Sequence, residues 1–163
     1  MFENKNLTYL EGLEFAEWVG MLAYIIAILA FGWLYSNSKT STSPIYQYYF
    51  RGLVFKLLGA IGFCLVYIYY YRGGDTIAYY ESTRAYVNLF AERPFDFLKV
   101  FFGENSIENY HLFDSNTGYP WYYMYADTKT LFVIKFITPF VFLAYKSYLL
   151  SSIFLSLISF FTL

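Results

Sequence analysis

The chain has 163 residues, of which 58% are apolar and 26% aromatic, while only 14% are charged against roughly 25% in an ordinary soluble domain. A net charge near −1 provides no basic field to hold nucleic acid, so we exclude that class of partner. The composition predicts an all-α fold, a polytopic helical integral membrane protein whose main partner is membrane lipid.

The sequence offers few residues that could bind a metal or a cofactor. Cys64 and His111 are the single cysteine and the single histidine, so neither a disulfide framework nor a histidine cluster can form within the chain. The sequence has no phosphate-binding glycine-rich loop, no serine-nucleophile motif and no zinc-protease motif. We therefore expect no metal and no cofactor.

The N-terminal region predicts one retained membrane helix. Residues 1–17 are polar and acidic, with four glutamates against one lysine, whereas a secretory signal begins with basic residues. Residues 18–36 then hold 19 positions without a charge, enough for a helix to cross a hydrocarbon core of about 30 Å. Trp18 and Trp33 near its two ends are typical of the interfacial aromatic belt.

A second membrane helix is expected over residues 52–71, after a polar connection over residues 37–51. Lys56 lies about one turn inside this span, where its stem can reach the head groups. Gly59, Ala60 and Gly62 predict a surface for close packing against another helix.

Residues 72–127 are predicted to form a partly helical extracytoplasmic loop, because so long a connection normally has structure of its own. A helix is expected over residues 77–92, ending before Pro94. Residues 103–121 are expected to be irregular. Between them, four apolar residues fall on one face of a short amphipathic helix that could lie on the membrane surface: Phe97, Leu98, Phe101 and Phe102.

The C-terminal region is apolar. We expect a short or embedded membrane helix over residues 128–145, bent near Pro139, and a membrane helix over residues 147–163. Lys135 and Lys146 lie in apolar surroundings and could pair with lipid phosphate groups. Because the last helix ends among apolar residues, we expect the chain to be a fragment of a longer protein with further spans.

The orientation follows from the short connections beside the spans. Residues 37–51 contain Lys39 and Arg51 and no acidic residue, whereas the N-terminus carries one lysine among four acids. Since basic connections face the cytoplasm, the N-terminus and the 72–127 loop should lie outside. For a bacterium, the location is then the cytoplasmic (inner) membrane.

The densest polar signal is Arg72-Gly73-Gly74-Asp75-Thr76, where the second span ends. One interpretation is structural: a glycine ends the span in a left-handed cap, and Asp75 or Thr76 caps the next helix. The alternative is that Asp75 acts as a base or binds a substrate, since a fixed and partly desolvated carboxylate has a raised pKa.

Two further groups could contribute to such a site. Glu81 lies about 240° around a helix from Asp75, so a glycosidase-like carboxylate pair is not supported, and a surface ion pair with Arg84 is the simpler interpretation. Five aromatic residues fall within residues 119–125, either as an interfacial belt or as faces that stack on sugar rings. Asp127 could cap the following helix or contact a ligand.

Four segments, in this order, resemble the N-terminal part of bacterial polysaccharide polymerases of the EpsG or Wzy type and related membrane glycosyltransferases. They are YRGGDTIAYY from residue 71, GYPWYYMYADTKT from 118, FVIKFITPF from 132 and KSYLLSSIFLSLISF from 146. The resemblance covers about residues 18–163. It implies glycosidic bond formation on an undecaprenyl-linked oligosaccharide at the outer face, in cell-surface polysaccharide synthesis.

Within this resemblance Asp75 matches an acidic residue placed as a catalytic base, and Arg72 matches a diphosphate or substrate contact. The remaining substrate-binding candidates are Thr76, Tyr79, Trp121 and Asp127. Two other functions stay open, a transporter or flippase component and a non-catalytic structural membrane subunit. The oligomeric state does not follow from the sequence.

Overall fold

A computed structural model describes residues 15–41 and 43–161 of the chain. Within these residues every regular element is a helix, as the sequence predicts. Most of the acidic segment expected over residues 1–17 lies outside the described residues, as do the last two positions of the helix expected over 147–163.

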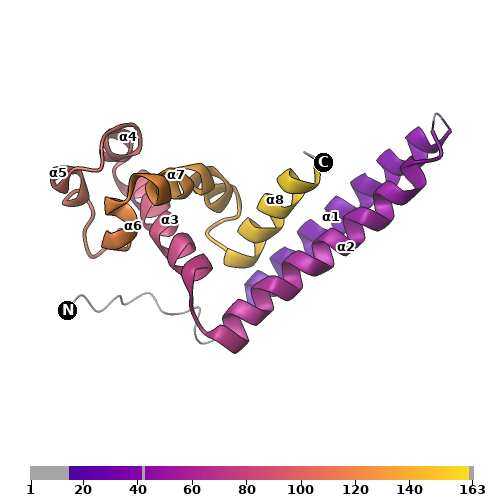
Figure 1. Ribbon diagram of the computed structural model, residues 1–163, viewed down its shortest axis with the longest axis horizontal. Helices are drawn as coiled ribbons and strands as arrows, with labels where there is room; N and C mark the ends of the chain where they lie inside the picture. Colours follow the sequence, from indigo (N-terminus) through magenta and orange to yellow (C-terminus); the bar gives the residue numbers. More distant parts are fainter. Residues whose placement is uncertain (1–14, 42, 162–163) are drawn as a thin grey trace.

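A long hairpin forms the first part of the fold. It consists of α1 (Phe15–Thr40) and α2 (Tyr46–Leu65), which η2 (Val66–Tyr71) continues as a π-helix. The two arms lie side by side (Figure 1). In the described part of the chain, Trp18–Thr40 and Tyr46–Tyr71 are long and apolar enough to cross a membrane, by length and composition.

Both arms of the hairpin extend beyond the predicted spans. Serine and threonine hydroxyls satisfy backbone carbonyls in the last turns of α1, where Thr40 Oγ1 donates to Ser36 O at 2.7 Å. The polar residues that suggested a connection are therefore helical as far as Thr40. Because α2 begins at Tyr46, Lys56 lies well inside the helix, and its Nζ donates to Ser159 Oγ at 3.0 Å.

Within the described residues, no other helix packs against Gly59 or Gly62, where the sequence suggested close packing. A Cβ atom added at either position would meet nothing within 4 Å. The close approach in the hairpin occurs instead at Gly32, where a Cβ would overlap the side chain of buried Leu53. Small residues alone did not indicate which glycine faces the neighbouring helix.

Five helices form a second region, called here the α3–α7 body: α3 (Asp75–Glu92), α4 (Pro94–Phe102), α5 (Ile107–Tyr110), α6 (Tyr122–Ala126) and α7 (Thr128–Leu143). The first begins two residues before its predicted start. The core of the α3–α7 body contains both aromatic and aliphatic side chains. Its buried members include Tyr86, Leu89, Val100, Phe113, Met124, Tyr125 and Ile134. Helix α5 corrects the expectation that residues 103–121 are irregular, and Ser106 caps it by accepting from Asn109 N at 3.2 Å.

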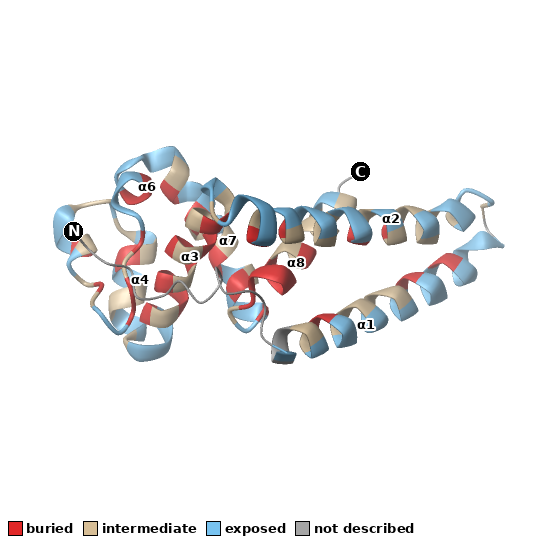
Figure 2. Cartoon of the chain, turned by 90° about the horizontal axis from the view of Figure 1, so that it is seen from below, coloured by how far each residue is buried: buried red, intermediate tan, exposed pale blue. Residues whose placement is uncertain are grey.

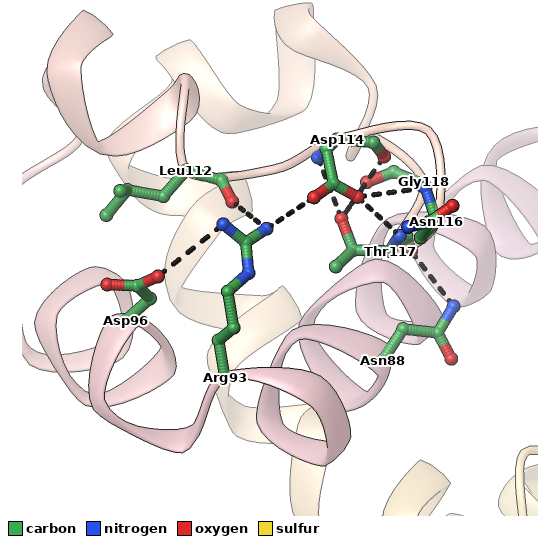
Figure 3. A network of polar contacts seen from close by, with 8 residues as sticks. All are labelled: Asn88, Arg93, Asp96, Leu112, Asp114, Asn116, Thr117 and Gly118. Carbon is green, nitrogen blue, oxygen red and sulfur yellow. Dashed lines mark hydrogen bonds and ion pairs between the residues drawn. The ribbon is translucent and has the colours of Figure 1, made fainter.

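Arg93 connects the α3–α4 junction to the loop after α5 (Figure 3). Its NH2 group lies 2.7 Å from both the carbonyl oxygen of Leu112 and Oδ2 of Asp114. Asp114 in turn accepts from the backbone N–H groups of Asn116 and Thr117. Asn88 on α3 donates to Thr117 O at 2.9 Å, so both ends of this loop are tied to α3.

The chain ends in α8 (Tyr148–Phe161), which lies along α2. The bend expected near Pro139 occurs further on: α7 continues through Pro139, and the direction changes by 112° between α7 and α8. Tyr145 and Lys146 make this turn with left-handed backbone angles, φ 50° and 61°. If the bent pair is one broken span, the described residues hold up to three candidate spans.

Candidate functional site

Asp75 is the first residue of α3, directly after the end of the hairpin. The left-handed cap at the end of η2 is Arg72, with φ 48°, rather than one of the two glycines. Gly74 is the N-cap of α3, and its carbonyl accepts from Ile77 N and Ala78 N. No side-chain hydrogen bond caps this helix start, so neither Asp75 nor Thr76 is the expected cap.

The Asp75 side chain is exposed rather than partly desolvated as expected from the sequence, and it is available to another group. It lies in the first turn of an 18-residue helix, where the unpaired N–H groups favour a negative charge. Arg72 is exposed three residues before it, and Thr76 is half-buried one residue after it. A carboxylate that does not cap its own helix can interact with another group.

Glu81 is a second carboxylate in this region, and burial changes its pKa. Its Oε2 accepts from Trp121 Nε1 at 2.9 Å, and Trp121 N donates to Ser82 Oγ at 3.0 Å. Burial raises the pKa of Glu81 above its ordinary value, although the hydrogen bond from Trp121 and the charge of Arg84 oppose the shift. A raised carboxyl pKa is the property that a general base requires near neutral pH.

Tyr123 on α6 lies within electrostatic reach of both carboxylates. Burial raises the pKa of Tyr123, and electrostatic interactions with Asp75, Tyr79 and Glu81 raise it further. We call Asp75, Tyr79, Glu81, Trp121 and Tyr123 the acidic–aromatic cluster. It combines residues of α3 with residues that follow 40 or more positions later.

Of the six site residues expected from the sequence, three belong to this cluster and three do not, namely Arg72, Thr76 and Asp127. Asp75, Tyr79 and Trp121 belong to the cluster. Asp127, in contrast, caps α7: its Oδ2 accepts from Thr130 N at 2.9 Å and from Thr130 Oγ1 at 2.6 Å. These hydrogen bonds hold the pKa of Asp127 below its ordinary range, which supports the capping interpretation.

The side chain of Lys135 has a protein partner, whereas the contact of Lys146 is made by its backbone carbonyl. Lys135 Nζ donates to Gly103 O, at the end of α4, over 3.0 Å. The carbonyl oxygen of Lys146 accepts a hydrogen bond from Tyr80 Oη of α3. Both contacts join the broken α7–α8 pair to the rest of the α3–α7 body.

Beside the cluster, a shallow depression is lined by Glu81, Arg84, Ala85, Asn88, Thr117, Gly118 and Tyr119. Asp75 does not line it. Glu81 thus belongs both to the depression and to the cluster, a role that sequence reasoning missed. Its partner Trp121 lies 40 positions away, so only the fold could show that the two side chains meet.

In the described ranges, no group of three or more His, Cys, Asp or Glu side chains could hold a metal ion. The chemistry available in the acidic–aromatic cluster is that of carboxylates, phenol hydroxyls and aromatic faces. Such groups accept hydrogen bonds from hydroxyls and pack against the apolar faces of sugar rings.

Comparison with known proteins adds no family. No family model, no curated protein and no solved structure matches the chain.

Proposed function

We propose that this chain acts on a lipid-linked oligosaccharide as a membrane-embedded polymerase or glycosyltransferase of cell-surface polysaccharide. The hairpin crosses the bacterial inner membrane with residues 41–45 in the cytoplasm, and the end of η2 emerges outside. The acidic–aromatic cluster is then where the sugars of an undecaprenyl-linked oligosaccharide bind.

One observation carries the proposal: a carboxylate without a capping role begins α3 at the membrane-emergent end of a candidate span. Tyr123 interacts electrostatically with Asp75, Tyr79 and Glu81, and Trp121 donates to Glu81. The cluster thus offers the ring faces and acceptors that saccharide recognition uses. The sugars of a membrane-anchored substrate would lie at the same level as this helix start.

The proposed chemistry is transfer of a glycosyl group to a hydroxyl. Asp75 accepts the proton of the attacking sugar hydroxyl as its oxygen bonds to the anomeric carbon of the donor. The bond from that carbon to the lipid diphosphate breaks, and the diphosphate leaves with the bonding electrons. Arg72 is placed three residues from Asp75, where its cation can balance the charge of the leaving group.

The substitution Asp75→Asn tests this role. Because Asp75 does not cap α3, loss of its charge should leave the helix intact. A general base contributes typically 10²- to 10⁴-fold in rate, so we expect assembly of surface polymer to fall to background while the protein stays in the membrane at its normal level. The measurement is surface polymer per cell, normalised to the amount of protein in isolated membranes.

Glu92→Gln is the matched control, since it neutralises an exposed carboxylate at the other end of the same helix. It should leave polymer assembly unchanged. Normal polymer from the Asp75→Asn protein would refute the catalytic role and leave a structural membrane subunit as the better description.

A transporter or flippase component is the second candidate. The 112° break between α7 and α8 favours it, because transporters often place substrate sites at broken membrane helices. In proteoliposomes that contain the lipid-linked oligosaccharide, a polymerase lengthens the saccharide, whereas a flippase moves it across the bilayer at constant length.

A further inference from the structure

Helix α4 has apolar residues on both of its sides. Phe97, Val100 and Phe101 face the core of the α3–α7 body. The opposite side turns outward Phe95 (85% exposed), Leu98 and Phe102 (78% exposed). The expectation that Phe97, Leu98, Phe101 and Phe102 share one face is therefore wrong, because neighbouring positions of a helix are about 100° apart and the four residues divide between the two sides. A second apolar side of this kind is typical of a surface that contacts protein or lipid, and within the described structure only one side of α4 is buried.

Helix α7 repeats this arrangement. Leu131, Ile134 and Val141 are buried on one side. Phe132, Phe136 and Leu143 are exposed and follow one another at intervals of four and seven residues, so they form one stripe along the helix. From residue 128 to residue 161 the sequence has no Asp or Glu. We call these six exposed residues the α4–α7 apolar surface.

Helix α7, which carries three of these six residues, belongs to the bent helix pair that could form a third candidate span. The other half of this pair, α8, packs against α2. Lys135 of α7 is hydrogen-bonded to the carbonyl at the end of α4, so the two helices are held together. In Figure 1, α4 and α7 lie in the upper part of the body, and α6 lies below them.

The charges near the surface fit phospholipid. Lys99 is exposed on α4 between Leu98 and Phe102, and Lys129 is exposed at the beginning of α7. The acid on α4, Asp96, is turned toward Arg93 at 3.5 Å. Lysines beside exposed phenylalanines are typical of interfacial helices, in which the rings enter the acyl region and the cations meet the phosphates.

We propose that the α4–α7 apolar surface is embedded in the phospholipid leaflet into which the end of the hairpin emerges. The α3–α7 body is therefore a membrane-embedded unit rather than a loop that projects into water. This arrangement holds the acidic–aromatic cluster at the membrane surface, within reach of a lipid-anchored substrate. The inference needs a membrane-crossing hairpin but does not depend on catalysis by Asp75.

Site-directed spin labelling of the whole chain tests this. Phe102→Cys and Phe136→Cys are each made in a Cys64→Ala background, labelled with a nitroxide and reconstituted in vesicles of phosphatidylethanolamine and phosphatidylglycerol. Collisions with oxygen, which concentrates in lipid, are compared with collisions with a water-soluble nickel complex. Both replaced side chains are exposed, so the labels should not disturb the core.

Two sites calibrate the measurement. A label at Phe55→Cys, exposed on α2, reports lipid, and one at Ser115→Cys, exposed in the loop after α5, reports water. We expect the oxygen-to-nickel ratio at Phe102 and Phe136 to approach that at Phe55 and to exceed that at Ser115 several-fold.

A ratio like that at Ser115 would place the surface in water and overturn the proposal. Low accessibility to both reagents would also overturn it, because it would show a second protein or a second copy on the surface. An oxygen-to-nickel ratio at Phe55 as low as that at Ser115 would show that the hairpin does not cross the membrane, and it would overturn the proposal as well. Normal polymer assembly by the Asp75→Asn protein would refute the catalytic role of Asp75 but would leave these labelling results unchanged.

Discussion

The hairpin and the α3–α7 body differ in what they bury (Figure 2). Within the described residues no aromatic side chain of the hairpin is buried, and many are exposed, as with Phe55 at 74%. In the body, Phe113 and Tyr125 are almost fully buried, and the hydroxyl of Tyr125 donates to Ser106 O at 3.0 Å. The hairpin therefore needs an apolar environment around its exposed side chains, whereas the body has a core of its own, which includes aromatic side chains.

Polar side chains connect distant segments of the body, as when Asn88 donates to Thr117 O and Tyr110 Oη to Pro120 O. In the last turns of α1, Ser38 and Thr40 bind carbonyls of their own helix, and Ser36 donates to Tyr46 O at the start of α2. A loop held by many such contacts has a defined shape, which a site composed of several elements requires.

The largest expected effect is on the core of the body. Phe113→Ala removes a buried ring that contacts Tyr86, Tyr110 and Tyr125, so it should lower the free energy of unfolding by about 3–5 kcal/mol. The matched change Phe55→Ala, on the exposed face of α2, should cost less than about 0.5 kcal/mol. Thermal unfolding of both variants in detergent checks this, and equal losses would contradict the comparison.

A smaller effect is expected inside the hairpin. Gly32→Val places a side chain where Leu53 lies, and such overpacking should cost about 1–3 kcal/mol. Gly59→Val is the control, because it makes the same change in a helix interior where nothing in the described structure lies within 4 Å. If Gly59→Val proved the more harmful in detergent melts, the packing of α1 on α2 would differ from that described here.

The smallest effect concerns the loop that Arg93 ties to α3. Arg93→Met removes the hydrogen bonds to Leu112 O and Asp114, and since the side chain is partly exposed we expect a loss of about 1 kcal/mol. Arg93→Lys keeps the charge but not the planar fork, so it should recover only part of that stability. Full recovery by lysine, in the same melts, would show that charge alone acts here.

The sequence was sufficient for elements whose signal is local. Long uncharged runs predict the two arms of the hairpin, and the helix before Pro94 ends where the proline requires. The ends of these elements were less predictable, because a polar stretch such as the one before Thr40 can be helical or form a connection.

Features that depend on distant partners could not be predicted. Glu81 appeared to be a simple surface acid because Trp121 is remote in sequence. Gly59 and Gly62 looked like packing positions because the sequence does not indicate which side of α2 meets α1. Asp127 had two interpretations until its bonds to Thr130 favoured the cap.

The central claim is that the hairpin crosses a membrane with the acidic–aromatic cluster outside. Its most direct test is labelling of single cysteines in intact cells with a thiol reagent that cannot cross the membrane, in a Cys64→Ala background. Ser41 lies in the connection between α1 and α2, and Ser115 lies in the loop after α5; both are exposed. The account predicts that Ser115→Cys reacts and that Ser41→Cys reacts only after the cells are permeabilised. The reverse pattern, or equal labelling of both positions in intact cells, would contradict it.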